Sequence, residues 1–255
     1  MPPVTLLHTS DLHGRLTPGA EERLAGLLKE HPSALLFDSG DACGAGNLGY
    51  RPHEPSLEAL SRLGCRAMAA GNREAHLWRV VMEKKLAAAR FPVLCANLTC
   101  RSGPSPCHSC VTVDTSGGAR LGVFGLTVPM ITRTMFSRHL SDLLFEDPIA
   151  TARELVPRLR QEHDALVLLS HLGLKRDREI AEAVPGIDVI LGGHSHVELQ
   201  VPERVGDTAL FQPGAHGLWA SLVTMEGTVG AWRVDGGLVA LREKAKKRPK
   251  GSGAE

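Results

Sequence analysis

The sequence predicts an α/β fold, and three observations support that class. Short runs rich in Val, Ile and Leu alternate with segments of helical periodicity, which is the pattern of βαβ units. The runs are apolar throughout rather than alternating, which indicates strands buried on both faces. The 255 residues are 43% hydrophobic, enough for a complete core. We therefore expect one larger domain over residues 1–242.

Local patterns place the elements of this domain. Strands are expected in the short apolar runs, at residues 4–8, 34–37, 66–69, 92–96, 121–125, 165–170 and 188–191. Helices are expected where apolar residues recur at helical spacing, at residues 21–30, 55–63, 74–89, 148–162 and 177–184. Pro148 suits the start of a helix, because a proline there sacrifices no hydrogen bond.

The pattern changes after Leu210. Short strands with Gly-containing turns follow at residues 221–225, 230–234 and 238–242, and we expect antiparallel hairpins that extend a second sheet edge. From Glu243 the chain is rich in Lys, Arg, Pro, Gly and Ser without apolar anchors, which predicts a disordered basic tail over residues 243–255.

Composition narrows the classes of partner. Lys and Arg number 29 against 28 Asp and Glu, so the net charge gives no strong signal for nucleic acid or an acidic membrane. The chain contains no run of about 18 apolar residues, so the sequence predicts no membrane span. The N-terminus has no export signal, so we expect a cytoplasmic protein whose six cysteines are reduced.

One cysteine-containing stretch leaves alternatives open. It holds Cys95, Cys100, Cys107 and Cys110, and the close spacing of the last two could hold a structural zinc or form a redox pair. The other interpretation is a surface loop that carries thiols, with Cys95 buried in a strand.

Metal-binding side chains follow five of the predicted strands. They are Asp11 with His13, Asp41, Asn72, His171, and His194 with His196. Each motif is common by itself, but together they fall at the carboxyl ends of strands, where the ligand sites of open α/β sheets collect. Imidazole, carboxylate and amide ligands suit a two-metal site.

These motifs resemble those of the calcineurin-like metallophosphoesterase superfamily, and in particular the catalytic domain of the 5'-nucleotidase family. The similarity runs over roughly residues 4–225 and carries the segments His8-Thr9-Ser10-Asp11-Leu12-His13-Gly14, Asp38-Ser39-Gly40-Asp41, Gly71-Asn72, Ser170-His171-Leu172-Gly173 and Gly192-Gly193-His194-Ser195-His196. It implies a two-sheet sandwich flanked by helices, with mixed strands and C-terminal antiparallel hairpins.

The resemblance also implies the metal ligands. One ion would be held by Asp11, His13, Asp41 and His196, and the other by Asp41, Asn72, His171 and His194, with Asp41 as the bridge. Two such cations, about 3.5–4 Å apart, hold a bridging hydroxide that attacks a phosphate ester. Mixed nitrogen and oxygen ligands suit Mn²⁺, Zn²⁺ or Fe. The segment 212–217 resembles a loop near the metals, so His216 is a candidate for contact with the substrate.

The sequence departs from the family at Arg73, where the motif usually has a histidine. Arginine stays protonated, so it can stabilise phosphoryl charge but cannot act as a general acid. His76 stands where these nucleotidases usually carry an aspartate. We predict that Arg73 binds the phosphate and that His76, or metal-bound water, protonates the leaving oxygen.

A second departure concerns the substrate. The chain ends too soon for the C-terminal domain with which family nucleotidases stack the base, and only 4% of its residues are aromatic. We therefore expect a small phosphate monoester or diester, selected by the loops at residues 43–55 and 128–143, rather than a nucleotide in particular. Loss of the motif histidine favours diesters or activated esters.

Two other functions remain open. The first is a catalytically impaired protein of the same fold that binds metal and phosphate without hydrolysis. The second assigns the function to the cysteine stretch, as a zinc- or thiol-mediated contact that recruits another protein.

Overall fold

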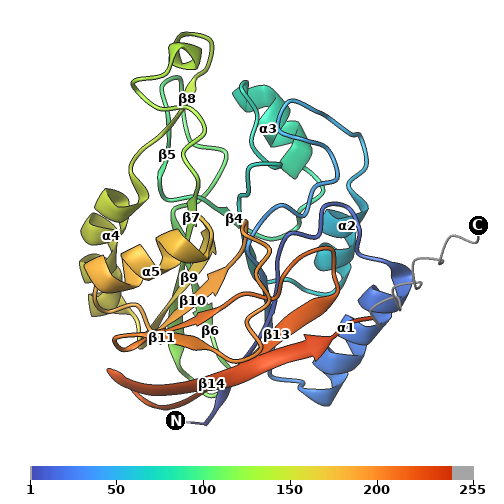
Figure 1. Cartoon of the computed structure of the whole chain (residues 1–255), viewed down its shortest axis with the longest axis vertical. Coiled ribbons are helices and arrows are strands. Elements are labelled where there is room, and N and C mark those ends of the chain that lie inside the picture. Colours follow the sequence, from blue (N-terminus) through green and yellow to red (C-terminus); the bar gives the residue numbers. More distant parts are fainter. Residues whose placement is uncertain (1, 243–255) are drawn as a thin grey trace, which may run out of the picture.

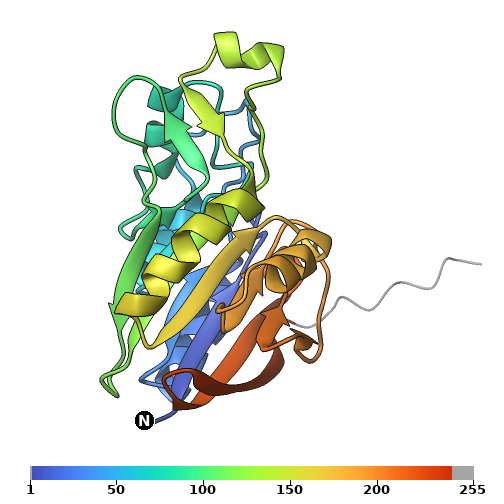
Figure 2. The same ribbon diagram turned by 90° about the vertical axis from the view of Figure 1, so that its left-hand side faces the viewer.

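Two six-stranded sheets pack face to face, and helices cover both outer faces (Figures 1 and 2). This architecture is seen in a computed structural model that describes residues 2–242. It confirms the predicted two-sheet α/β class. The predicted basic tail, residues 243–255, lies outside the described residues.

The first sheet contains the N-terminal strands. Its order is β14 (Ala231–Ala240), β13 (Trp219–Thr228), β1 (Val4–Thr9), β2 (Leu35–Asp38), β3 (Ala67–Ala69) and β4 (Val93–Leu94). Strands β1 to β4 run parallel, and β13 is antiparallel to β1. The parallel strands therefore end at one common edge.

The second sheet contains most of the later strands. Its order is β11 (Glu203–Val205), β12 (Thr208–Phe211), β10 (Val189–Gly192), β9 (Ala165–His171), β7 (Arg120–Thr127) and β6 (Cys110–Asp114). Strands β7, β9, β10 and β12 are parallel, as buried strands joined by helical crossovers usually are. A small sheet pairs β5 (Leu98–Cys100) with β8 (Leu143–Phe145).

Three hydrophobic clusters join the four layers. Helices α1 (Pro18–Glu30), α2 (Pro55–Arg62) and α3 (Arg79–Leu86) pack with the outer side chains of the first sheet. The inner faces of the two sheets form the second cluster. Helices α4 (Pro148–Glu162) and α5 (Leu174–Ala183) cover the second sheet. Helix α4 begins where predicted, with Asp147 as its N-cap and Pro148 in the first turn.

Three local expectations were wrong. The predicted helix at residues 74–89 is only α3, because residues 71–78 form turns beside the first sheet. The three short C-terminal strands are two long ones, β13 and β14, which form one hairpin at the free edge beside β1. The predicted strand at 92–96 is reduced to β4, because the chain leaves the sheet to pair with His108 and Gly125.

A projection rises from the sheets next to α3. It consists of β5, β8 and the segment between β7 and β8, which includes a short 3₁₀ helix at Phe136–His139 (Figure 1, top). Its polypeptide returns to the main body through β8 and α4. The projection forms one wall of a cavity that the loop after β2 and the turn before α3 also line.

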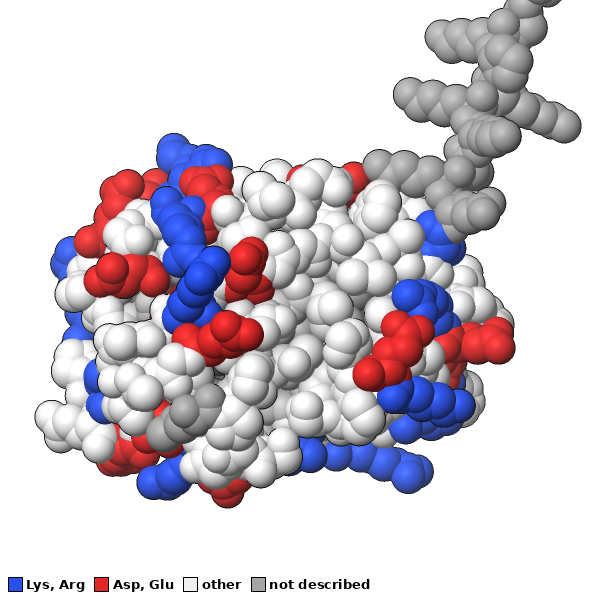
Figure 3. Space-filling model, turned by 90° about the horizontal axis from the view of Figure 1, so that it is seen from below, with Lys and Arg blue, Asp and Glu red and all other residues white. Residues whose placement is uncertain are grey.

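Charges of both signs are mixed on the lower surface of the molecule (Figure 3). Seen from below, the molecule carries acidic and basic side chains in two mixed groups with uncharged surface between them, rather than a field of one sign (Figure 3). No helix within residues 2–242 combines the length and apolarity needed to cross a membrane. The cytoplasmic location stays a prediction.

Candidate metal centre

The structure brings all seven predicted ligand residues to one place between the two sheets. Asp11, Asp41 and Asn72 lie in the loops after β1, β2 and β3 of the first sheet. His171 ends β9, and His194 with His196 follow β10 of the second sheet. Parallel strands present their carboxyl ends together, so residues up to 185 positions apart along the chain meet at this edge.

The backbone at this edge is unusual. Within residues 2–242, the non-glycine residues with positive φ are six candidate site residues: Asp11, His13, Asp41, His194, His196 and His216. Their φ angles lie between 51° and 70°. The left-handed conformation costs an L-residue about 1 kcal/mol or more, so six of them together approach the net stability of a domain. Such concentration of strain is typical of a functional site.

Backbone hydrogen bonds between loops stabilise these conformations. The N–H groups of Asp11 and His13 donate to the carbonyls of Gly40 (2.9 Å) and Asp41 (2.8 Å). The N–H of His216 donates to the carbonyl of Asp11 (2.8 Å). At Gly40 a Cβ would lie 2.9 Å from Nδ1 of His171, so only glycine allows the loops to approach this closely.

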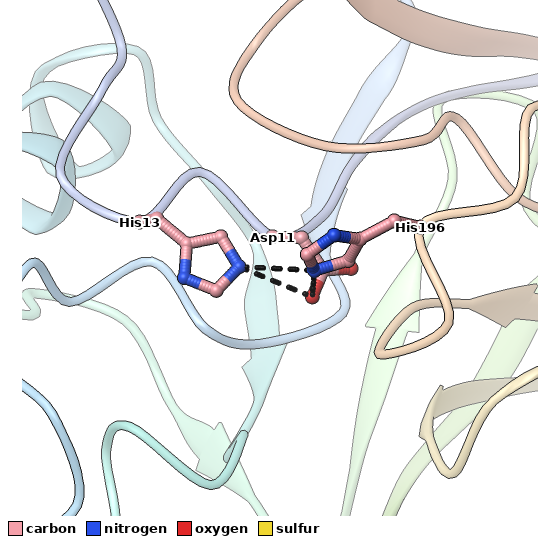
Figure 4. A group of neighbouring side chains, drawn as sticks. All are labelled: Asp11, His13 and His196. Carbon is pink, nitrogen blue, oxygen red and sulfur yellow. Dashed lines mark hydrogen bonds and ion pairs between the residues drawn. The ribbon is translucent and has the colours of Figure 1, made fainter.

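Asp11, His13 and His196 form what we call the outer group (Figure 4). Nε2 of His13 lies 3.1 Å from Nε2 of His196, and Oδ1 of Asp11 lies 3.2 Å from the latter. Oδ1 of Asp11 is buried and has no hydrogen-bond partner. Oδ2 of the same carboxylate accepts hydrogen bonds from Ser10 Oγ (2.8 Å) and His194 N (2.9 Å).

Asp11, Asp41 and His171 form the inner group, and all three are buried. Oδ1 of Asp41 lies 3.4 Å from Nε2 of His171, while its Oδ2 lies 4.0 Å from Nε2 of His13. The two oxygens of Asp41 therefore face the two groups. Oδ1 of Asn72 lies 3.2 Å from Nε2 of His171 and 3.1 Å from Nδ1 of His194.

A layer of buried hydrogen bonds orients the inner group. Nδ1 of His171 lies 2.7 Å from the carbonyl of Ser39, which accepts its proton and leaves the lone pair of Nε2 facing Asp41. Glu74 is fully buried, and its carboxylate accepts the N–H groups of Asp41, Cys43 and Gly71, each at 2.8 Å. This carboxylate ties the loop after β2 to the loop after β3.

The charges at the site favour ligation. Burial opposes ionisation of Asp11, but the nearby His13 ring and the charge of His171 outweigh that effect, so the pKa of Asp11 is lowered. Burial and the neighbouring His171 lower the pKa of His194. Carboxylates that are ionised and imidazoles that are neutral near pH 7 are the forms that bind metals.

These residues fit divalent cations. Several lone pairs at the site face one another instead of hydrogen-bond donors. They belong to the unpartnered, buried Oδ1 of Asp11, to two imidazole nitrogens 3.1 Å apart, and to an amide oxygen between two further imidazoles. Buried polar atoms are normally paired, so these groups suit a bound cation. The donor set of nitrogen and oxygen matches a transition metal better than Mg²⁺ or Ca²⁺. The roles of the individual ligands stay predictions.

Arg73 lies against the inner group. Its backbone N–H donates to Oδ1 of Asp41 (2.7 Å), and its Nε lies 3.7 Å from Oδ2 of the same residue. One Nη donates to the carbonyl of Gly44 (3.2 Å), and the side chain is 31% exposed. The guanidinium is thus fixed at the side of the site and still accessible to a ligand.

His76 and His216 occupy different surroundings. Nδ1 of His76 accepts the N–H of Trp78 (3.0 Å), and the residue lines a cavity beside the site. Burial, followed by the charge of Lys85, lowers the pKa of His76. The ring centroid of His216 lies 5.1 Å from that of His13 and 5.7 Å from that of His196. His216 therefore lies beside the outer group, and its contact with a substrate stays a prediction.

The cysteine stretch forms no three-ligand zinc site in the part of the chain that the structure describes. Within residues 2–242, no group of three or more His, Cys, Asp or Glu with convergent ligand atoms contains a cysteine. Cys95 and Cys107 are buried, whereas Cys100 and Cys110 are partly exposed, and all are free thiols. Burial raises the pKa of the Cys107 thiol to about 12, so it is an unreactive thiol near pH 7. The structure therefore gives no zinc site among the described residues, and it also corrects the loop interpretation. Cys100 and Cys110 lie in strands β5 and β6 of different sheets, and the buried Cys95 follows β4 instead of lying in a strand.

Sequence reasoning missed the residues that orient the site. The expected helix at residues 74–89 gives Glu74 no role at the site, and Ser39 has no role of its own in the motif. Both residues stand close to predicted ligands in the sequence, which was the available signal for a role at the site. Their hydrogen bonds to neighbouring loops could not be inferred, because those depend on how the loops pack.

The site and fold define a class of metal-dependent phosphoesterase. The calcineurin-like phosphoesterase family model matches residues 4–198, and the chain belongs to this family. Bovine 5'-nucleotidase is 30% identical over 77% of this chain and 38% of its own length. The Bacillus subtilis metallophosphoesterase YunD is 29% identical over 86% of this chain and 49% of its own length.

Solved structures agree with this placement. The 5'-nucleotidase precursor of Thermus thermophilus superposes with a TM-score of 0.77 at 26% identity, over 93% of this chain and 55% of that chain. This chain spans less than half the length of the curated relatives described above. Family membership supports a metal-dependent hydrolase that acts on phosphate esters.

Proposed function

We propose that the protein hydrolyses small phosphate esters at a centre of two divalent cations. The observation that carries the proposal is the convergence of seven N- and O-donor side chains, with a buried carboxylate oxygen of Asp11 left unpartnered. Bound cations would supply a nucleophilic oxygen near neutral pH and neutralise phosphoryl charge.

The groups of this chain would divide the work. The outer group and the inner group would each hold one cation, with the two oxygens of Asp41 directed to the two positions. The Ser39 carbonyl orients His171, which is itself a proposed ligand. Glu74 fixes the loop of Asp41 by accepting a hydrogen bond from its backbone N–H. A site held in place before substrate arrives loses little energy to reorganisation.

Arg73 would bind the phosphoryl group. Its guanidinium is held by the Gly44 carbonyl beside Asp41, and a fork of N–H donors matches phosphate oxygens. His76 stands in the wall of the adjoining cavity and is the proposed proton donor to the leaving oxygen, with solvent as the other source. His216, beside His13, would face the substrate from the opposite side.

The proposal is tested by hydrolysis with added Mn²⁺, Zn²⁺ or Fe²⁺. The substrates are p-nitrophenyl phosphate, its bis-p-nitrophenyl diester and adenosine 5'-monophosphate, which separate monoester, diester and nucleotide activity. We expect turnover that a chelator abolishes and that Asp41→Asn reduces by more than the roughly 10²–10³-fold typical of losing one oxyanion donor.

Exposed Asp207→Asn, between β11 and β12, is the matched control and should leave turnover unchanged. Turnover that survives both chelator and Asp41→Asn would refute the metal-dependent mechanism. Binding of two cations and of phosphate without hydrolysis of any ester would support the alternative, an impaired binding protein.

A further inference from the structure

A cavity of about 290 Å³ lies between three segments near the candidate metal centre. The segments are the loop after β2, the turn before α3 and the projection. Six of the nine lining residues are apolar: Leu48, Ala75, Leu77, Met130, Ile131 and Phe145. The other three are Asn47, His76 and Ser137, so none of the nine is an Asp, Glu, Lys or Arg.

Asn72 joins this cavity to the metal centre. Its Nδ2 donates to Oδ1 of Asn47 in the cavity wall at 3.4 Å. Its Oδ1 lies 3.2 Å from Nε2 of His171 and 3.1 Å from Nδ1 of His194. Because the oxygen and nitrogen of one amide share a carbon, a single side chain separates the candidate ligands from the cavity. A group attached to a phosphate at the metal centre is therefore within reach of it.

Buried hydrogen bonds fasten the walls together. Lys85 is 1% exposed, and its Nζ donates to the carbonyls of Gly46 (3.0 Å) and Ala75 (3.4 Å), on two different walls. Ser141 Oγ donates to the carbonyl of Leu77 (2.5 Å), which connects the second wall to the projection. The cavity is consequently a built feature of the fold and not a gap between loops.

Leu48 lies at the mouth of the cavity and is 80% exposed. An exposed leucine beside a mostly apolar hollow gains free energy when an apolar group covers both. We infer that the cavity binds the uncharged organic group of the phosphate ester, a compact apolar group such as an aryl ring. This inference rests on the proposed function, because it takes the phosphate to lie at the metal centre.

The lining also excludes other substrates. A second phosphate or a carboxylate would be buried without a charged partner, which is costly. Phe145 is the one Phe, Tyr or Trp among the nine lining residues, so the wall offers no pair of such rings to stack a nucleoside base. A volume near the lower end for ligand pockets suits a group of about one ring. The chemistry thus favours esters with one phosphate and one apolar group.

Calorimetric titration of the Mn²⁺-loaded full chain tests the inference without turnover. Three phosphonates share a P–CH₂ linkage and differ in the group beyond it: ethylphosphonate, benzylphosphonate and phosphonoacetate. We expect benzylphosphonate to bind about tenfold or more tightly than ethylphosphonate, as burial of an aromatic side chain would give. Phosphonoacetate should gain nothing from its carboxylate.

Leu48→Asp places a charge at the mouth and should reduce the benzyl preference, the ratio of benzylphosphonate to ethylphosphonate affinity, several-fold. Val229→Asp, in the turn between β13 and β14, is the matched control and should retain the preference. Both positions are exposed, and thermal unfolding of each variant verifies that it is folded.

The outcomes separate the two proposals. Equal binding of ethyl- and benzylphosphonate, or a benzyl preference that survives Leu48→Asp, overturns the cavity inference and leaves the hydrolase proposal standing. Tighter binding of phosphonoacetate than of benzylphosphonate also overturns it. If no phosphonate binds, both the inference and the placement of phosphate at the metal centre are wrong.

Discussion

The outer and inner groups share Asp11 but are built differently. In the inner group, the side chain of His171 is fully buried, and the Ser39 carbonyl fixes its ring. In the outer group, the side chain of His196 is 42% exposed, and Nδ1 of His13 has no hydrogen-bond partner. One half of the centre is oriented by the fold, whereas the other half presents donors that a cation would have to organise.

The two halves of the centre would therefore take up a cation at different energetic cost. A preorganised set of donors binds an ion with little loss of side-chain freedom, whereas an unfixed set must be ordered at the moment of binding. We therefore expect the inner position to bind its cation more tightly than the outer position.

The largest expected effect comes from two single variants, each of which removes one histidine, from the inner group in one case and from the outer group in the other. His171→Ala should lower turnover by more than about 100-fold, because even the loss of an outer hydrogen-bond partner costs 10–100-fold. His196→Ala should cost less, since water can enter at an exposed position and serve as a ligand. Metal analysis after dialysis should find less metal in His171→Ala than in His196→Ala. Equal losses in the two variants would remove the distinction between the groups.

Arg73 provides an intermediate effect on the inner side. Arg73→Ala should lower kcat/KM by about 10²-fold, the scale of losing one donor to developing phosphoryl charge. Its metal content should not change, because the guanidinium is a phosphate contact in the proposal. Arg23→Ala, at an exposed pair with Glu30 in α1, is the control. Unchanged turnover in Arg73→Ala would exclude Arg73 from phosphate binding.

The last effect is on stability rather than on turnover and concerns Asp177 of α5, which accepts a hydrogen bond from Ser170, the residue before His171. Burial raises the pKa of Asp177 to about 8, from 3.8. Between those values the folded protein binds more protons than the unfolded chain, so stability should fall as pH rises from about 4 to 8. The slope is at most about 1.4 kcal/mol per pH unit.

Asp177→Asn keeps the shape of the protonated side chain and should remove that slope, so the variant gains stability relative to the original protein at pH 8. Urea unfolding at pH 5, 6.5 and 8 measures this, with Asp207→Asn as the exposed control. An Asp177→Asn protein with the same slope as the original would show that another group titrates.

Local sequence determined much of this protein. The apolar runs specified most strands of the two sheets, and Asp147-Pro148 specified the start of α4, because neighbours along the chain decide burial patterns and helix caps. The motifs with Asp11, Asp41, Asn72 and His171 could be recognised because their residue types and their order along the chain are those of a known family. The class of the fold followed from the same information.

The remaining features depend on contacts between loops that are separate in the sequence. The chain at residues 71–78 turns instead of continuing into a helix, because Glu74 is drawn into three hydrogen bonds with loops that are distant or adjacent in sequence. The left-handed backbones of Asp11 and His196, the arrival of His216 beside His13, and the cavity closed by Lys85 depend on contacts between separate loops. Strain and enclosure of this kind exist only when the loops have packed, because the free energy that maintains them comes from that packing.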